Sequence, residues 1–116
     1  MKIHTKIWLE TNAGKLLVGE GRLDIFKAIK RTGSLSAAAR ELGMSYRAVW
    51  GKVRATEERL GFKLVQGMAG GHKRGGTQLT EEGDQFVTRF EAFDKRARSA
   101  VNELAEELLL DLLKEE

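Results

Sequence analysis

The feature that most constrains the fold is residues 35–53, which read as two short helices joined by a glycine turn. Ser34 stands just before the first helical segment, where a serine side chain favours helix initiation. Gly43 supplies a residue that tolerates a positive φ, as the turn between the helices requires. Ala38 and Ala39 are small enough to let the two helices cross closely. Residues 35–53 therefore predict a helix-turn-helix.

The second helix of this pair is predicted to run from about Tyr46 to Leu60, with Ser45 as its N-cap and Gly61 as its end. One side of the pair is apolar and would fill the wedge between the helices: Leu42, Met44, Val49 and Val53. The opposite side would stay open to solvent: Ser45, Tyr46, Arg47, Trp50, Gly51 and Arg54. The N-terminal half of such a helix is the part that enters the DNA major groove in helix-turn-helix proteins.

The side chains on this open face suit DNA. Arg47 and Arg54 can reach guanine edges or phosphates. Ser45 and Tyr46 offer hydroxyls near a helix N-terminus, which itself attracts anions. Gly51 would let the helix backbone approach the duplex closely. We therefore expect this helix to be the recognition helix.

Several neighbouring residues allow two interpretations. Trp50 either stacks on a sugar or a thymine methyl, or belongs to the apolar side of the helix. Arg59 and Lys63 are either phosphate contacts or plain solvated charges. Ser34 and Ser36, at the start of the first helix, complete the predicted DNA contacts.

A helix over about residues 22–31 precedes this pair, and two short strands follow it, over 63–66 and 77–79. Between the strands, residues 67–76 hold five glycines and three possible cations, His72, Lys73 and Arg74. The order helix–helix–helix–strand–loop–strand is that of a winged helix, and cations at the wing tip would contact the DNA backbone or minor groove. The predicted fold is mainly α with a small β component.

The N-terminal segment alternates apolar and polar residues from Ile3 to Glu10, a period-two pattern typical of a strand. Residues 12–14 can form a turn, and residues 16–18 a returning strand. We therefore expect a β-hairpin over residues 2–18. The chain divides into a hairpin region (1–20), a helix-turn-helix with its wing (21–79) and a C-terminal helix (80–116), all within one domain.

The last segment predicts one long helix, capped by Thr80 and continuing to about Lys114. Its apolar residues recur at coiled-coil spacing: Phe86, Phe90, Phe93, Ala97, Val101, Leu104, Leu108 and Leu112. Such a helix is about 50 Å long, whereas a chain of this size folds to a diameter of about 35 Å. We expect these residues to form a homodimer interface, unless the helix folds back or breaks near Arg98 and Ser99.

The charge is divided along the chain. Residues 1–79 hold 15 Lys and Arg against 6 Asp and Glu, whereas residues 80–116 hold 5 against 11. A basic body with an acidic helix suits a polyanion partner on one side only. Cysteine is absent, no apolar run is long enough to span a membrane, and no signal peptide opens the chain. We expect a cytoplasmic protein with no cofactor, no metal, no membrane association and no enzymatic activity.

Residues 33–40, 43–50, the glycine-rich wing and residues 79–83 together resemble ModE-type molybdate-dependent regulators and, more widely, the DNA-binding region of LysR-type regulators. The resemblance covers roughly residues 20–95. It implies a homodimeric winged helix-turn-helix that binds a palindromic operator, usually as a repressor. It also places Ser45, Tyr46, Arg47 and Trp50 on the recognition helix, and Lys73 and Arg74 on the wing. We expect a stand-alone form of the family without the molybdate-binding half, whose effector, if any, is unknown.

The sequence thus predicts a dimeric regulator that binds double-stranded DNA sequence-specifically. Two alternatives remain at this point. One is a protein-interaction adaptor, suggested by Trp8 on the polar side of the predicted hairpin. The other is an architectural DNA-binding protein without sequence preference.

Overall fold

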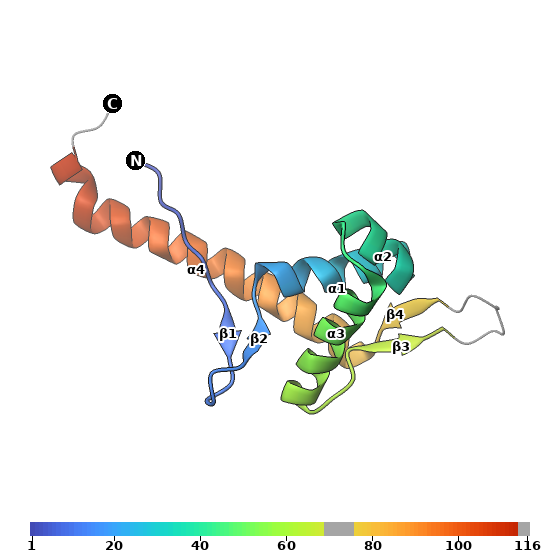
Figure 1. Ribbon diagram of the computed structural model, residues 1–116. Coiled ribbons are helices and arrows are strands. Elements are labelled where there is room, and N and C mark those ends of the chain that lie inside the picture. Colours follow the sequence, from blue (N-terminus) through green and yellow to red (C-terminus); the bar gives the residue numbers. More distant parts are fainter. Residues whose placement is uncertain (69–75, 114–116) are drawn as a thin grey trace.

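The computed structural model describes residues 1–68 and 76–113 (Figure 1). Three helices form the body of the molecule: α1 (Glu20–Thr32), α2 (Leu35–Leu42) and α3 (Tyr46–Leu60). Ser34 Oγ accepts a hydrogen bond from the Ala37 amide, and Ser45 Oγ accepts one from the Ala48 amide, so both predicted N-caps are confirmed. Gly43 follows α2 with a φ of 67°, as the turn requires.

The core lies where the three helices meet. Its buried residues come from all four helices and from the chain after α3, with α1 and α2 contributing the most: Ile25, Phe26, Ala28, Ile29, Leu35, Ala38, Ala39, Val49, Val53, Leu64, Val65 and Val87. Ala38 is fully buried at the α2 crossing, where a larger side chain would separate the helices. Leu42 and Met44 pack half-buried against this cluster, so the predicted apolar wedge is confirmed.

The wing begins directly after α3. Strands β3 (Val65–Gly67) and β4 (Thr77–Leu79) pair antiparallel. The Thr77 amide donates to the Gly33 carbonyl at 2.9 Å, which ties the wing to the turn between α1 and α2. The predicted order of three helices followed by two paired strands is thus confirmed. The predicted wing-tip residues His72, Lys73 and Arg74 lie outside the described residues.

The N-terminal hairpin is shorter than predicted. Strand β1 (Leu9–Glu10) pairs antiparallel with β2 (Leu16–Val18), and an irregularity interrupts their register. Residues 1–8 have no strand partner among the described residues and run along the last helix (Figure 1). Every second one of them is half-buried and the others are exposed. The period-two pattern thus marks one covered face, and the predicted strand over residues 2–8 is wrong.

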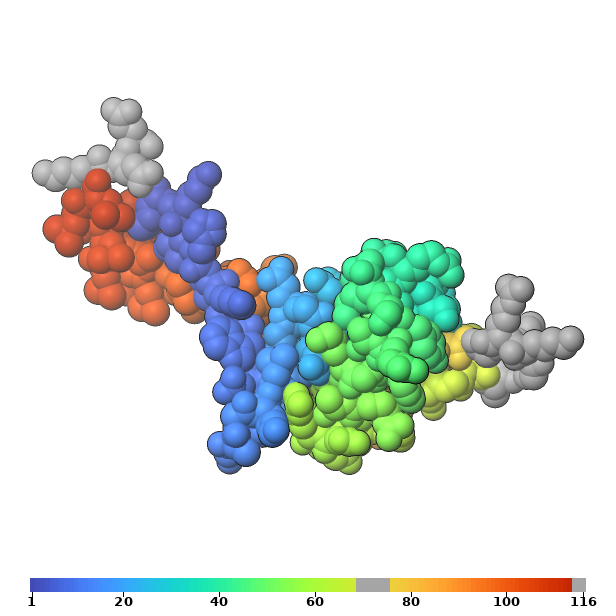
Figure 2. Space-filling view, viewed as in Figure 1, coloured from blue at the N-terminus to red at the C-terminus, as the bar shows by residue number. Residues whose placement is uncertain are grey.

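The last helix, α4 (Glu81–Leu113), is continuous over 33 residues. It neither folds back nor breaks near Arg98, so both alternatives to a single long helix are excluded. Thr80 Oγ1 accepts from the Gly83 amide at 2.9 Å, which confirms the predicted cap. Only the first turns of α4 pack on the body, and the rest projects away from it (Figures 1 and 2), giving overall dimensions of 62 × 32 × 23 Å.

Candidate nucleic-acid interface

The N-terminal half of α3 presents an open surface. Ser45, Tyr46, Arg47, Gly51 and Arg54 are all exposed, while Val49 and Val53 on the opposite side are fully buried. Tyr46 keeps 54% of its surface accessible, so both its ring and its hydroxyl are available to another molecule. The structure therefore brings together on one face the residues that the sequence predicted for the recognition helix.

Trp50 combines the two interpretations that the sequence left open. Its ring is half-buried and packs against the core cluster. The Arg54 guanidinium lies 5.6 Å from the ring centroid, a cation–π contact. Trp50 thus belongs partly to the core, and its outer surface supports the position of Arg54 on the open face.

The two predicted serines of α2 differ in their surroundings. Ser34 is half-buried and its hydroxyl oxygen caps α2, so that oxygen already accepts a hydrogen bond. Ser36 is exposed in the first turn of the same helix. Only Ser36 therefore has a side chain wholly available to another molecule.

Arg22 of α1 fixes the position of α3, a role for which the sequence pattern gives no sign. Its Nη1 donates to the Lys52 carbonyl at 3.0 Å and to Thr56 Oγ1 at 2.5 Å. Burial lowers the pKa of Arg22 from its ordinary value, and the nearby charge of Arg59 lowers it further. The side chain acts here as a donor between two helices rather than as a surface charge.

Arg59 decides against one of the two interpretations that the sequence left open. It is not a plain solvated charge, because it is half-buried and its Nη1 donates to the Leu16 carbonyl of β2 at 2.6 Å. Lys63 is exposed, and its Nζ lies 3.9 Å from Glu57 Oε1. The sequence does not reveal this contact, because an arginine on the polar face of a helix has the same spacing whether or not it bonds to a distant carbonyl.

Glu57 connects α3 to the wing. The side chain is buried, and its Oε2 accepts from the amides of Leu64 and Val65 at 2.8 and 3.2 Å. These amides stand at the start of β3, so the carboxylate sets the distance between the recognition helix and the wing. The sequence gives no sign of this role, since a glutamate beside Glu58 in a helix is usually exposed.

The predicted interface residues of α4 fall into two groups. Phe86 and Phe90 lie near the body: Phe86 packs on the core and Phe90 is 5% exposed. Ala97 and Val101 are half-buried. The outer residues are open to solvent: Phe93, Leu104, Leu108 and Leu112. Leu109, Leu110 and Leu113 add to the exposed apolar surface at this end.

None of the helices within residues 1–68 and 76–113 is long and apolar enough to cross a membrane. No group of three or more His, Asp or Glu side chains in the same residues is arranged to hold a metal ion.

Comparison with known proteins identifies the family. Residues 21–84, more than half of the chain, match the family of bacterial regulatory helix-turn-helix proteins of the lysR type. The molybdenum-pterin-binding protein MopB of Rhodobacter capsulatus is 36% identical over 94 residues, which are 81% of this chain and 35% of MopB. The molybdenum transport protein ModE of Azotobacter vinelandii is 35% identical over 100 residues, 86% of this chain and 37% of ModE. The chain thus spans little more than a third of the length of these relatives.

A solved structure supports the same assignment. The crystal structure of the CbnR DNA-binding domain in complex with DNA superimposes with a TM-score of 0.55 and 26% identity, covering 73% of this chain and 95% of that chain. The family match over residues 21–84 contains nearly all of α1, the whole of α2 and α3, and both wing strands. The chain therefore belongs to the bacterial regulatory helix-turn-helix proteins of the lysR family, which are DNA-binding transcription regulators, and has ModE-type regulators among its homologues.

Proposed function

We propose that this protein is a homodimeric, sequence-specific regulator that binds double-stranded DNA through α3 and the wing. The observation that carries the proposal is the exposed face of α3, where Tyr46, Arg47 and Arg54 surround an open Gly51. Gly51 has no neighbour within 4 Å of the position that a Cβ would take, so the backbone is accessible there. The DNA complex of the related CbnR domain supports the same use of the fold.

Affinity and specificity come from different residues in this proposal. Phosphate neutralisation by cations supplies most of the affinity and makes it depend on salt. Base edges are contacted by Ser45, Tyr46, Arg47 and Arg54, and a good bidentate contact discriminates by about 1–3 kcal/mol. Ser34, Ser36 and Trp50, with His72, Lys73 and Arg74 of the wing, complete the proposed contact surface. No cofactor takes part.

The second copy binds along α4 in this proposal. The outer residues Phe93, Leu104, Leu108 and Leu112 are 48–71% exposed, and large continuous apolar surfaces on a protein usually mark an interface. Phe90 contributes to the protomer's own core, and Ala97 and Val101 extend the interface toward it. A two-fold dimer would place its recognition helices about 34 Å apart, one turn of DNA.

The mode of action that we propose is occupancy. A dimer bound to its operator excludes the transcription machinery, as a repressor does, and the protein works in the cytoplasm, where the bacterial chromosome lies. The acidic stretch of the chain lies mainly on α4, whose outer part projects away from the DNA-binding face. This separation lets a chain with a net charge of only +3 bind a polyanion.

Fluorescence anisotropy tests the proposal. The full chain is titrated into two labelled duplexes, its own upstream region and a random sequence, between about 50 and 300 mM salt. Preference for the upstream duplex with a steep salt slope is expected. Equal weak binding to both duplexes would indicate an architectural protein instead, and no binding at any salt would favour a protein-interaction adaptor.

Two variants separate the proposed roles. Arg47→Ala should reduce the preference for the upstream duplex, by up to about 1–3 kcal/mol. Lys73→Ala should weaken binding to both duplexes equally. The slope of log affinity against log salt concentration should become shallower by about one, the contribution of a single phosphate contact. If Arg47→Ala changed neither affinity nor preference, the docking of α3 would be wrong.

A further inference from the structure

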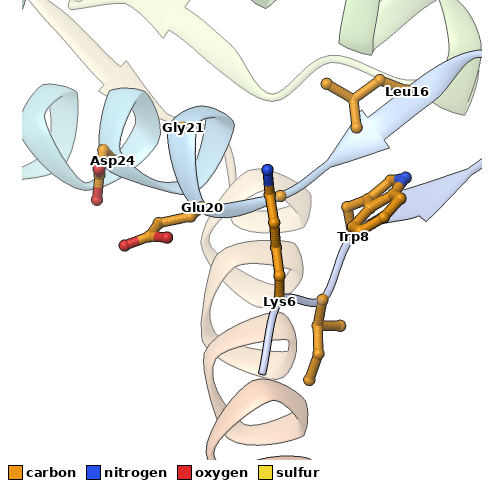
Figure 3. A pocket seen from close by; sticks show the side chains of 8 residues that line it. Lys6, Trp8, Leu16, Glu20, Gly21 and Asp24 are labelled. Atoms are coloured by element: carbon orange, nitrogen blue, oxygen red, sulfur yellow. The ribbon is translucent and has the colours of Figure 1, made fainter. Parts of the chain in front are cut away.

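A pocket of about 550 Å³ opens between the N-terminal segment, β2 and the start of α1 (Figure 3). One side is formed by the N-terminal segment and β2, with Lys6, Trp8 and Leu16. The other is the first turns of α1, with Glu20, Gly21 and Asp24. The volume falls within the range of small-molecule sites, roughly 300–1,000 Å³.

The charges that line the pocket have both signs. Glu20 and Asp24 are exposed on neighbouring turns of α1, and neither forms an ion pair among the described residues. Lys6 extends across the pocket between them and Trp8 (Figure 3), with its Nζ 5.8 Å from the centroid of the Trp8 ring. The two free carboxylates stand out in a part of the chain whose net charge is strongly positive, so this pocket is unsuited to DNA.

The remaining lining is apolar. Ile7, Trp8 and Leu16 form the walls, and Gly21 leaves open space because no atom lies within 4 Å of the position its Cβ would take. A ligand ammonium would satisfy Glu20 and Asp24, a ligand carboxylate would pair with Lys6, and an apolar side chain would lie against the Trp8 ring. We propose that this pocket binds an apolar α-amino acid as a zwitterion.

Both walls of the pocket are hydrogen-bonded to α3. Leu16 accepts from Arg59 of α3 through its carbonyl oxygen, and Arg22, which follows Gly21, donates to the Lys52 carbonyl and to Thr56. A ligand that draws the two walls together therefore acts on two of the hydrogen-bonded contacts that hold α3, those of Arg59 and Arg22. Bound amino acid changes the affinity for DNA by this route, a step that rests on the proposed function.

Binding is tested on the free protein with matched probes. L-Phenylalanine, phenethylamine and 3-phenylpropionate share one ring but carry both charges, only the ammonium, or only the carboxylate. Calorimetry should give the tightest binding for L-phenylalanine, with each truncated probe weaker by roughly tenfold, the loss expected for one charge-assisted hydrogen bond. The Trp8 indole N–H signal in the NMR spectrum, assigned with Trp8→Phe, should shift on titration. Equal affinities for the three probes would overturn the proposal. So would the absence of L-phenylalanine binding at concentrations up to about 10 mM, measured on protein that sedimentation shows to be dimeric.

Variants locate the site. Glu20→Gln with Asp24→Asn should weaken L-phenylalanine by at least about tenfold, and Gly21→Met should abolish binding by filling the pocket. The matched control is Glu103→Gln with Glu107→Gln, another pair of exposed carboxylates four residues apart on a helix, and it should bind as the unmodified chain does. Unchanged binding in both pocket variants would place the ligand elsewhere and overturn the assignment.

The coupling has a separate readout. DNA affinity is measured by anisotropy with and without L-phenylalanine, in the unmodified chain and in Gly21→Met. A several-fold change that disappears in Gly21→Met is expected. Ligand binding with no effect on DNA binding would overturn the coupling alone. If the unmodified chain bound L-phenylalanine but did not bind DNA with or without it, the proposed function would be contradicted instead.

Discussion

Glu57 shows how one buried carboxylate holds two elements in place. Removing its side chain leaves the amides of Leu64 and Val65 without their acceptor, and an unsatisfied buried group costs about 1–3 kcal/mol. We expect Glu57→Ala to lower the free energy of unfolding by about 2–4 kcal/mol. Glu57→Gln should cost less, because the amide oxygen can still accept. Urea denaturation measures both, with the exposed neighbour Glu58→Ala as the control within about 0.5 kcal/mol.

Gly83 and Gly51 differ in the space that surrounds them. A Cβ on Gly83 would stand 2.2 Å from the Leu64 carbonyl oxygen, whereas one on Gly51 meets nothing within 4 Å. Gly51→Ala should therefore stabilise α3 by up to about 1 kcal/mol, the difference in helix propensity. If the α3 backbone approaches DNA at Gly51, the same variant should bind its duplex more weakly. Higher thermal stability with unchanged DNA affinity would show that this part of α3 stays clear of the duplex.

The elements were predictable from sequence wherever local chemistry decides them. Serine N-caps and C-terminal glycines predict where α2 and α3 begin and end, and the structure confirms these ends. The segment before β1 was not predictable, because alternation reports one covered face and does not say what covers it; here α4 takes the place of a partner strand. Contacts of Arg22, Arg59 and Glu57 also escaped sequence analysis, since a polar side chain on a helix looks the same whether it is solvated or bonded to a distant backbone group.

The contact between β2 and α3 gives a prediction for whole elements. Arg59→Met keeps most of the aliphatic stem but removes the donor to the Leu16 carbonyl. The hairpin β1–β2 should then open more often, so its amides should exchange with deuterium faster while those of α2 are unaffected. Lys63→Met, an exposed cation close in sequence, is the control. Uniformly faster exchange in all helices would mean that Arg59 stabilises the whole body instead.

The length of α4 gives the whole molecule its elongated shape. The body alone could bind one half-site, whereas the projecting helix with its exposed leucines would give a second copy, as proposed above, a place to bind. Ion pairs from Lys27 to Glu91 and from Lys30 to Asp84 join α1 to the base of α4. They are largely exposed and contribute little stability, but they help to fix the direction of α4 relative to α3. The spacing of two recognition helices would therefore be set partly by α1.

The proposed dimer can be broken without unfolding the protomer. Leu104 and Leu108 are 53% and 64% exposed, so Leu104→Glu with Leu108→Glu should leave the circular dichroism spectrum unchanged. Sedimentation should show at least about a hundredfold weaker dimer, because two charges would enter an apolar interface. Leu110→Glu is the control, since Leu110 lies about 200° around the helix from Leu108. The monomeric variant should also lose about half of the salt slope on DNA, because each protomer neutralises its own set of phosphates. An unchanged sedimentation profile would exclude this face of α4 as the interface.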